Sequence, residues 1–334
     1  MTRATAAILD RRAVIRIGGP DVRDYLQGLV SNDIAKVTPE RTIWAAFLTP
    51  QGKFLHEFFI AADPTVPAAP PVFLIECEAA RREDLQRRLA LYRLRAKVDI
   101  EDVTNRFAVA VAFGAGAPDA FGLPMVPGRT VPFAGGLAAV DPRLADLGVR
   151  LVVPRARLPE ALSAAGLATC DPEAYERLRI GLGVPEGSRD LEVERATLLD
   201  HGFDELNGID WDKGCYIGQE LTARMKYRAL VKKRLVPVTI DGPSPAPGTP
   251  VTRDGADAGT LRSVAGDVGL ALLRLEHIVD AAPGALRAGE ARLSVRIPAW
   301  LDLERAHKER TAPSGPAGST GQSGETRERR DAGR

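Results

Sequence analysis

Residues 211–236 read WDKGCYIGQELTARMKYRALVKKRLV, and this stretch says most about both fold and function. The spacing of Gly218, Leu221 and Met225 predicts a helix that begins shortly after Cys215. Unpaired N–H groups at a helix N-terminus favour a thiolate, and Lys213 adds positive charge two residues earlier. The sequence therefore predicts a reactive cysteine that could act as a nucleophile or as a metal ligand.

Two glycines flank this cysteine. Gly214 and Gly218 leave the backbone uncovered, which would let a flat ligand or another chain approach closely. The alternative is that Cys215 is a small buried hydrophobic residue, as most free cysteines are. Cys77, within an alternating strand pattern, and Cys170, in a linker, have no special neighbours, and we assign both to that structural class.

A basic run follows the motif, with Tyr227 inside it. Its members are Arg224, Lys226, Arg228, Lys232, Lys233 and Arg234. Such a run could hold phosphates, a polyglutamate tail or RNA, although solvated charge on a helix and linker is the usual explanation. The stretch 184–212 before the motif is acidic, but its order does not show that any two carboxylates converge.

The chain on the N-terminal side of the motif has the pattern of an α+β body. A strand and a helix are expected at 13–17 and from Val22, and a hairpin at 43–60 turns at Thr49-Pro50-Gln51-Gly52. Further strands are expected at 71–78, 106–114 and 149–154, with helices after residue 78 and from Asp171.

On the C-terminal side, from Lys233, short strands alternate with turns, which predicts a small antiparallel barrel or sandwich. Beyond Leu303 there is no large hydrophobic residue, so this tail is expected to be disordered.

Composition narrows the class of protein. The chain has 334 residues, 45% hydrophobic and 27% charged, with a net charge of +1, so charge gives no reason to expect nucleic acid or an anionic membrane as a partner. No apolar run is long enough to span a membrane, and no signal core follows the N-terminal arginines. Three dispersed cysteines without a CxxC or Cys/His pairing indicate neither disulfides nor a resident metal site. We expect a bacterial cytoplasmic protein rather than one of the mitochondrial matrix.

The motif KGCYIGQE, with LTAR directly after it and KKRLVPV at 232–238, resembles the signature of the YgfZ family. These are folate-binding proteins of iron–sulfur cluster assembly, with mitochondrial relatives. The resemblance extends through YLQGLVSNDI at 25–34, FLTPQGKFLHEFFI at 47–60 and LYRLRAKV at 91–98.

The resemblance implies a fold. The family shares the architecture of the T-protein of the glycine cleavage system, an aminomethyltransferase. We therefore expect an α+β, folate-binding body of two subdomains at residues 1–231 and a C-terminal antiparallel β-barrel at 232–302. The tail at 303–334 falls outside the resemblance.

The resemblance also implies a site. Activity in the family depends on the motif cysteine, here Cys215, and the motif lysine, here Lys213, lies beside it at the folate site. Asn32 and Asp33 match a polar pair that is expected to face the same cavity. The other residues expected to help bind the cofactor are Gly214, Tyr216, Gly218, Gln219, Glu220 and Arg224.

Two positions depart from the related proteins. Gly181 stands where T-proteins carry a pteridine-binding glutamate, so pteridine recognition is expected to differ or to be weaker. Residues 199–202, LDHG, replace a proline, an acid and an asparagine that are common in the family, which affects the expected cavity wall.

The leading hypothesis is a folate-dependent maturation factor that assists assembly, insertion or repair of [4Fe–4S] clusters in client enzymes, some of which modify tRNA. Cys215 would be the working thiol, with tetrahydrofolate or a one-carbon derivative as cofactor. A cluster could be held transiently with a client or carrier protein, because one cysteine cannot supply four ligands.

Two alternatives remain open. One is a folate-dependent aminomethyl or methyl transferase, which needs a carboxylate at the folate nitrogen. The other is a tRNA-binding module that uses Lys232, Lys233 and Arg234 and ignores Cys215, although we do not expect direct nucleic-acid binding.

Overall fold

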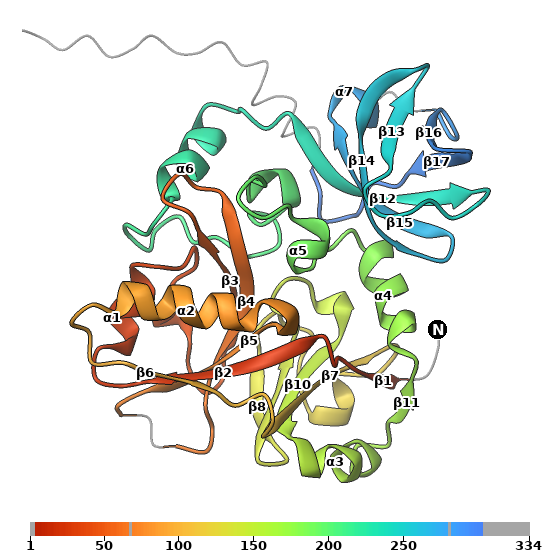
Figure 1. The fold of residues 1–334 in the computed structure, drawn as a ribbon. Coiled ribbons are helices and arrows are strands. Elements are labelled where there is room, and N and C mark those ends of the chain that lie inside the picture. Colours follow the sequence, from red (N-terminus) through yellow and green to blue (C-terminus); the bar gives the residue numbers. More distant parts are fainter. Residues whose placement is uncertain (1–3, 67–68, 280–281, 303–334) are drawn as a thin grey trace, which may run out of the picture.

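Two antiparallel-rich sheets form the body of the protein, and a closed barrel follows them (Figure 1). The structure is a computed structural model that describes residues 4–66, 69–279 and 282–302. The predicted disordered tail, residues 303–334, lies outside the described residues. The α+β body with a C-terminal barrel is as predicted.

The first sheet has five antiparallel strands. In spatial order they are β3 (Ile43–Leu48), β4 (Phe54–Ala62), β5 (Val72–Glu78), β2 (Arg12–Gly18) and β6 (Asp99–Asp102). The predicted hairpin is β3 and β4, and its turn is closed by the Gly52 amide, which donates to the Thr49 carbonyl at 2.8 Å.

The two faces of this sheet pack against different parts of the protein: one against helices and the other against the second sheet. Ile15, Phe58 and Ile75 point to one face and pack with the helices α1 (Val22–Gln27) and α2 (Arg82–Arg93). Cys77 belongs to this cluster, and burial raises the pKa of its thiol to about 12, in keeping with a structural role. The residues between them, such as Val14, Phe59 and Leu74, point to the second sheet.

The second sheet has six strands, of which β11 pairs with β1 in parallel and the rest are antiparallel. In spatial order they are β11 (Ala168–Cys170), β1 (Thr5–Ile8), β7 (Phe107–Phe113), β10 (Val149–Pro154), β9 (Gly136–Val140) and β8 (Thr130–Phe133). Helix α3 (Leu158–Ala164) packs on its outer face. The predicted helix from Asp171 is α4 (Pro172–Gly181), capped by the Asp171 side chain.

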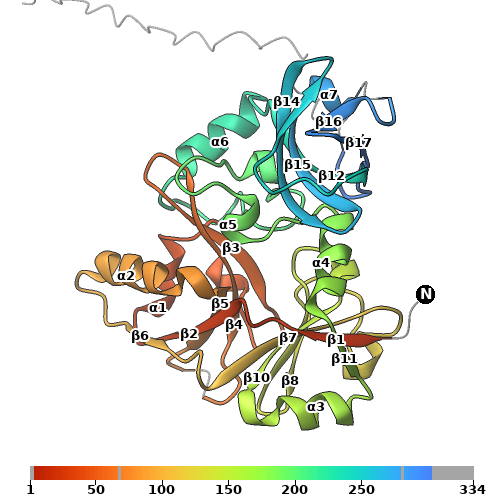
Figure 2. The ribbon, with the colours of Figure 1, turned by 45° about the vertical axis from the view of Figure 1, so that its right-hand side comes forward.

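The C-terminal region is a barrel rather than a sandwich. Its six antiparallel strands close in the order β12 (Lys233–Asp241), β15 (Val268–Arg274), β14 (Ala256–Ala265), β13 (Pro250–Arg253), β16 (Leu286–Ala288) and β17 (Ala291–Val295). The short helix α7 (Glu276–Val279) follows β15. Helix α5 (Gly187–Asp190) lies between the body and the barrel, and α6 (Gln219–Tyr227) lies beside the turn of the β3–β4 hairpin (Figures 1 and 2).

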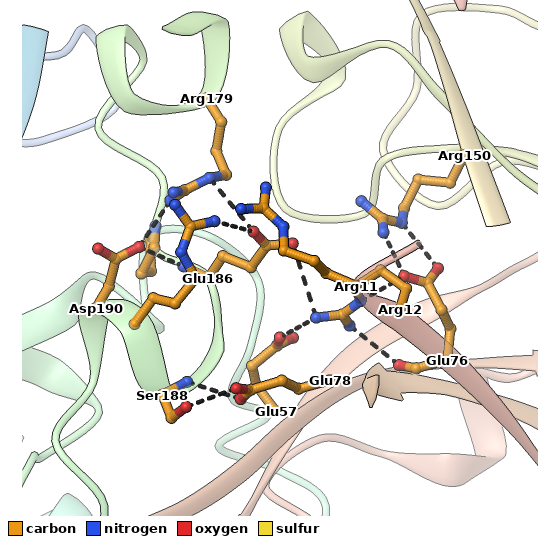
Figure 3. A network of polar contacts seen from close by, with 12 residues as sticks. Arg11, Arg12, Glu57, Glu76, Glu78, Arg150, Arg179, Glu186, Ser188 and Asp190 are labelled. Carbon is orange, nitrogen blue, oxygen red and sulfur yellow. Dashed lines mark hydrogen bonds and ion pairs between the residues drawn. The ribbon is translucent and has the colours of Figure 1, made fainter. Parts of the chain in front are cut away.

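A network of buried charges joins the two sheets (Figure 3). Arg12 of β2 donates from Nε to Glu76 Oε1 at 2.8 Å and from Nη1 to Glu57 Oε1 at 2.7 Å. Arg150 of β10 donates from Nε to Glu76 Oε2 at 3.0 Å. Burial alone would raise the pKa of Glu76, but the charges of Arg150 and Arg12 outweigh it and hold that pKa below its usual value. Glu76 is therefore ionised between two arginines from different sheets.

The same network reaches the barrel. Arg179 of α4 donates from Nη1 to Asp190 Oδ2 of α5 at 2.7 Å, and Ser263 of β14 donates to the other oxygen of Asp190 at 2.5 Å. Further members in the interior are Asp141, Arg143, Glu176 and Glu186. Body and barrel are thus tied together by side chains that the sequence did not single out.

Candidate functional site

The motif loop, residues 213–218, packs against the end of α1. The Ile217 amide donates to the Gly28 carbonyl at 3.1 Å, and Gln27 donates from Nε2 to the Lys213 carbonyl at 3.0 Å. The side chain of Ile217 packs in the same cluster as Tyr92 and Ala96, which lie at the end of α2 and just after it. The loop is therefore held at both its ends by the helical side of the five-stranded sheet.

Lys213 anchors this loop. Its Nζ donates to the Gln27 carbonyl at 2.7 Å and to the Val30 carbonyl, and it lies 4.9 Å from the centre of the Tyr216 ring. Burial lowers the pKa of Lys213 to about 8, and the carboxylates of Asp33 and Asp210 oppose this shift only in part. The ammonium is thus committed to the end of α1, which is a positioning role for the loop.

We expect the Lys213 amine to titrate near pH 8. The unfolded chain keeps a lysine pKa of 10.5, so between about pH 8 and pH 10.5 it binds more protons than the folded chain. The free energy of unfolding of the wild type should therefore rise with pH across this window, relative to Lys213→Met. Urea unfolding at several pH values checks this, and parallel pH dependences in the two proteins would contradict it.

Tyr216 and Gln219 shape the start of α6. The predicted helix begins at Gln219, with Gly218 at its N-cap in a left-handed conformation, and the Gln219 side chain accepts a hydrogen bond from the Tyr216 amide at 3.1 Å. The Tyr216 ring is buried, and burial raises the pKa of its hydroxyl to about 12. In the described structure both side chains serve the local fold, and their predicted part in cofactor binding stays a prediction.

Gly218 lies in backbone contact with the β3–β4 turn. A Cβ atom added to Gly218 would lie 2.4 Å from the Thr49 carbonyl oxygen and 3.0 Å from the Gly52 Cα, and φ is +82°. At Gly52, an added Cβ would lie 2.7 Å from the Gly218 carbonyl oxygen. The close approach predicted from this glycine is therefore made by the chain's own hairpin.

Gly218→Ala should loosen the loop from the hairpin. The rigid backbone contact cannot yield to a methyl group, so we expect a loss of about 1–3 kcal/mol in stability, measured by chemical unfolding. The control is Gly214→Ala, where φ is +87° but an added Cβ meets nothing within 4 Å. If both variants lose the same amount, backbone conformation alone explains the effect and the contact with Thr49 is not needed.

Cys215 lies exposed at the tip of this anchored loop. Cys77 is buried and Cys170 half-buried, so Cys215 is the exposed thiol among the described residues. Neighbouring Gly214 leaves open space on the solvent side. The prediction of a cysteine just before a helix is confirmed, and the alternative of a buried hydrophobic cysteine is wrong for this residue.

The predicted polar pair after α1 is fixed by hydrogen bonds. Asn32 donates from Nδ2 to the carbonyls of Trp44 and Asn207, both at 2.8 Å. Asp33 caps the short helix η1 (Ile34–Lys36) through the Ala35 amide. Asp33 also accepts a hydrogen bond from Gln27 at 2.9 Å. Gln27 lies in the YLQGLVSNDI stretch, but it was not among the predicted site residues.

A cavity of about 290 Å³ opens beside Asn32. Its lining is basic and amide-rich, without a carboxylate: Asn32, Lys36, Arg41, Thr42, Ile43, Trp44, Pro127, Pro142, Asn207 and Ile209. Lys36 is paired with Asp210, whereas no ion pair engages the exposed Arg41 within the described residues. Of the residues predicted to bind a cofactor, Asn32 alone lines this cavity, and Lys36 and Arg41 carried no signal in the sequence.

The basic run divides into paired and free members. Lys226 pairs with Asp204 at 3.0 Å, and buried Arg234 pairs with Glu205 at 2.7 Å. Within the ranges that the structure describes, Arg224, Arg228 and Lys232 have no carboxylate partner and are exposed. Glu220 is also exposed on α6.

The two departures from the related proteins lie outside this cavity. Gly181 ends α4, and an added Cβ there would meet nothing within 4 Å. Leu199–His201 form a short helical turn, η6, in which His201 is buried and its Nδ1 lies 2.8 Å from the Thr197 carbonyl. Burial lowers the pKa of His201, so this histidine is a neutral structural residue at neutral pH.

The described ranges show neither a cluster of metal ligands nor a membrane-spanning helix. No group of three or more His, Cys, Asp or Glu side chains there is placed to hold a metal ion. No helix there has the length and apolar character that crossing a membrane requires.

The architecture of the chain is similar to that of known proteins. Residues 232–303 match the family model "CAF17, C-terminal beta-barrel domain". The chain superposes on the glycine cleavage system aminomethyltransferase T from Bartonella henselae with a TM-score of 0.70, covering 90% of this chain and 87% of that one. At 12% identity this likeness shows the fold, and the predicted aminomethyltransferase-like architecture is confirmed.

Sequence relatives narrow the family. The mitochondrial iron–sulfur cluster assembly factor IBA57 of Mus musculus is 34% identical, and that of Homo sapiens 35%. Each comparison covers 87% of this chain and 84% of the relative. Because these relatives are named as mitochondrial, the prediction of a bacterial cytoplasmic protein is wrong. The YgfZ resemblance is also corrected, to a related family: the chain belongs to the IBA57 family of iron–sulfur cluster assembly factors.

Proposed function

We propose that the chain assists assembly, insertion or repair of [4Fe–4S] clusters in client enzymes, with Cys215 as its working thiol. Membership of the IBA57 family supports the class of process. The observation that carries the specific role is an exposed cysteine at the tip of a loop that Lys213 and Gly218 anchor.

The chemistry follows from the number of ligands. A [4Fe–4S] cluster is generally held by four ligands, and Cys215 offers one thiolate. A carrier or client protein must therefore supply the others, so that the cluster lies between two proteins. The anchored backbone on both sides of Cys215 limits where the sulfur can go, which favours ligation in one fixed geometry.

The test is transfer of a cluster to an apo-enzyme. Purified chain, a cluster-loaded carrier and an apo [4Fe–4S] enzyme should restore enzyme activity faster than carrier and apo-enzyme alone. Equal rates with and without the chain would remove the proposed function.

We further propose that tetrahydrofolate or a one-carbon derivative binds in the cavity beside Asn32. The donor set suits it, because Arg41 has no carboxylate partner among the described residues and can pair with a carboxylate of the folate glutamate, while Lys36, paired with Asp210, adds a second basic group to the lining. Thr42 and Asn207 also line the cavity, where their side chains bond to the Thr130 hydroxyl and the Pro142 carbonyl. When bound, the folate would be held and oriented by these residues.

Arg41→Ala should weaken tetrahydrofolate binding about tenfold, because it removes one charge-assisted contact. Calorimetric titration of the wild type and the variant measures this. The control is Arg287→Ala, which removes an exposed arginine of the barrel strand β16 that is not among the cavity residues. Equal weakening in the two variants, or no folate binding in the wild type, would contradict this site.

No observation favours a transferase over the assembly role. Transfer of a one-carbon unit needs a carboxylate at the folate nitrogen, and the cavity lining has none. The alternative of tRNA binding through Lys232, Lys233 and Arg234 loses support, because Arg234 is buried and already paired with Glu205.

A further inference from the structure

The outer side of α6 is an exposed surface next to Cys215. Glu220, Arg224 and Tyr227 follow one another at helical spacing and are exposed, while Thr222 and Met225 on the opposite side are buried. Just after the helix, Leu230 is 42% exposed. We call the α6 surface the set Arg224, Tyr227, Arg228, Leu230 and Lys232.

Tyr227 is the exposed aromatic side chain of this surface. Its side chain is 75% exposed, yet its ring makes an edge contact with Trp211 at 6.2 Å. Trp211 is itself held, since its Nε1 donates to Asp204 at 2.6 Å and Lys226 lies 4.0 Å from its ring. An exposed aromatic ring that already packs against a neighbouring ring loses less entropy on binding than a ring without such a contact, and tyrosine and arginine are enriched among the residues that dominate protein interfaces.

The positive charge of the α6 surface indicates what kind of partner can bind there. Arg224, Arg228 and Lys232 have no carboxylate partner in the described part of the chain, whereas Lys226 and Arg234 are neutralised by Asp204 and Glu205. Glu220 is the one acidic residue on this side of α6. A surface with three free cations around two apolar side chains is complementary to an acidic protein surface with an apolar centre.

The distance to the cysteine fits a single interface. Nine helical residues from Gln219 to Tyr227 span about 12 Å, and Cys215 lies four residues before that helix. A standard interface covers roughly 800 Å² on each partner, about 30 Å across, so one protein can cover Tyr227 and reach Cys215.

We propose that the α6 surface is the docking site for an acidic iron–sulfur carrier protein, which thereby brings its own cluster ligands to Cys215. This inference rests on the proposed function. Docking on α6 and ligation by Cys215 are separate steps, so each can be removed without the other.

The test measures the affinity of the full chain for a purified, acidic iron–sulfur carrier in its apo form, by calorimetry at low and at physiological salt. Tyr227→Ala and the double variant Arg224→Glu/Arg228→Glu should each weaken binding about tenfold or more. Because the double variant replaces attraction to an acidic partner with repulsion, added salt should no longer weaken its binding. Ile297→Ala and the double variant Arg287→Glu/Arg292→Glu, which change exposed residues on the barrel side, are matched controls and should bind as the wild type does.

Cys215→Ser separates the two proposals. It should dock on the apo carrier with wild-type affinity but fail to transfer a cluster. If Tyr227→Ala and the double arginine variant bind like the wild type while Cys215→Ser is inactive, the docking site is wrong and the proposed function stands.

RNA is the competing occupant, because tyrosine can stack on a base and arginine can bind phosphate. The same variants are therefore titrated with tRNA. If tRNA binds with a steep salt dependence that the double arginine variant abolishes, and carrier affinity is unchanged, the surface is a nucleic-acid site and the proposal is overturned.

Discussion

Cys215→Ser is expected to abolish most of the cluster-transfer activity and to leave stability unchanged. Oxygen in place of sulfur removes a soft thiolate ligand for iron. The side chain is exposed, and the anchors of its loop lie at Lys213 and Gly218, so the substitution disturbs no packing. Exposed substitutions of this kind change the free energy of unfolding by no more than about 0.5 kcal/mol.

The measurement is the rate at which purified protein restores an apo [4Fe–4S] enzyme from a loaded carrier, together with chemical unfolding of both proteins. Cys170→Ser is the matched control, because that cysteine is half-buried at the end of β11 and no role is proposed for it. Full activity of Cys215→Ser would show that cluster transfer does not depend on the thiol of this loop. Loss of activity in both variants would point to a general defect.

Local signals in the sequence predicted the motif loop well. A cysteine followed by a helix, and a hairpin with proline and glycine in its turn, depend on residues that are close in the chain, and both are present. What holds the two elements together was not predictable in the same way. Gly218 touches Gly52, and Lys213 binds the carbonyls of Gln27 and Val30, so these contacts join residues more than 160 positions apart.

The direction of Lys213 shows why the site is harder to predict than the fold. Its place two residues before Cys215 suggested a charge beside the thiol, but the backbone of the loop turns the ammonium toward α1. Side-chain direction in an irregular loop is set by long-range contacts and leaves no periodic pattern in the sequence. For the same reason, Lys36 and Arg41 of the cavity could not be told from solvated surface charge.

Arg12→Met is expected to have the largest effect on stability, a loss of about 3–5 kcal/mol. The Arg12 side chain is 1% exposed and donates hydrogen bonds to Glu57 and to Glu76 (Figure 3). Methionine fills the volume but leaves Glu57 without an arginine partner and Glu76 with Arg150 alone, so charge stays buried without compensation. Chemical unfolding of the wild type and the variant measures the loss.

The neighbouring residue provides the control. Arg11 also forms an ion pair, with Glu176 at 3.1 Å, but its side chain is 53% exposed, so Arg11→Met should cost less than about 1 kcal/mol. Adding Glu57→Gln to Arg12→Met should recover part of the loss, because it removes one of the uncompensated charges. If Arg11→Met and Arg12→Met cost the same, burial does not set the strength of this network. In that case the two sheets would be joined by their apolar core, in which Phe59 and Val152 take part, and not by Glu76 between Arg12 and Arg150.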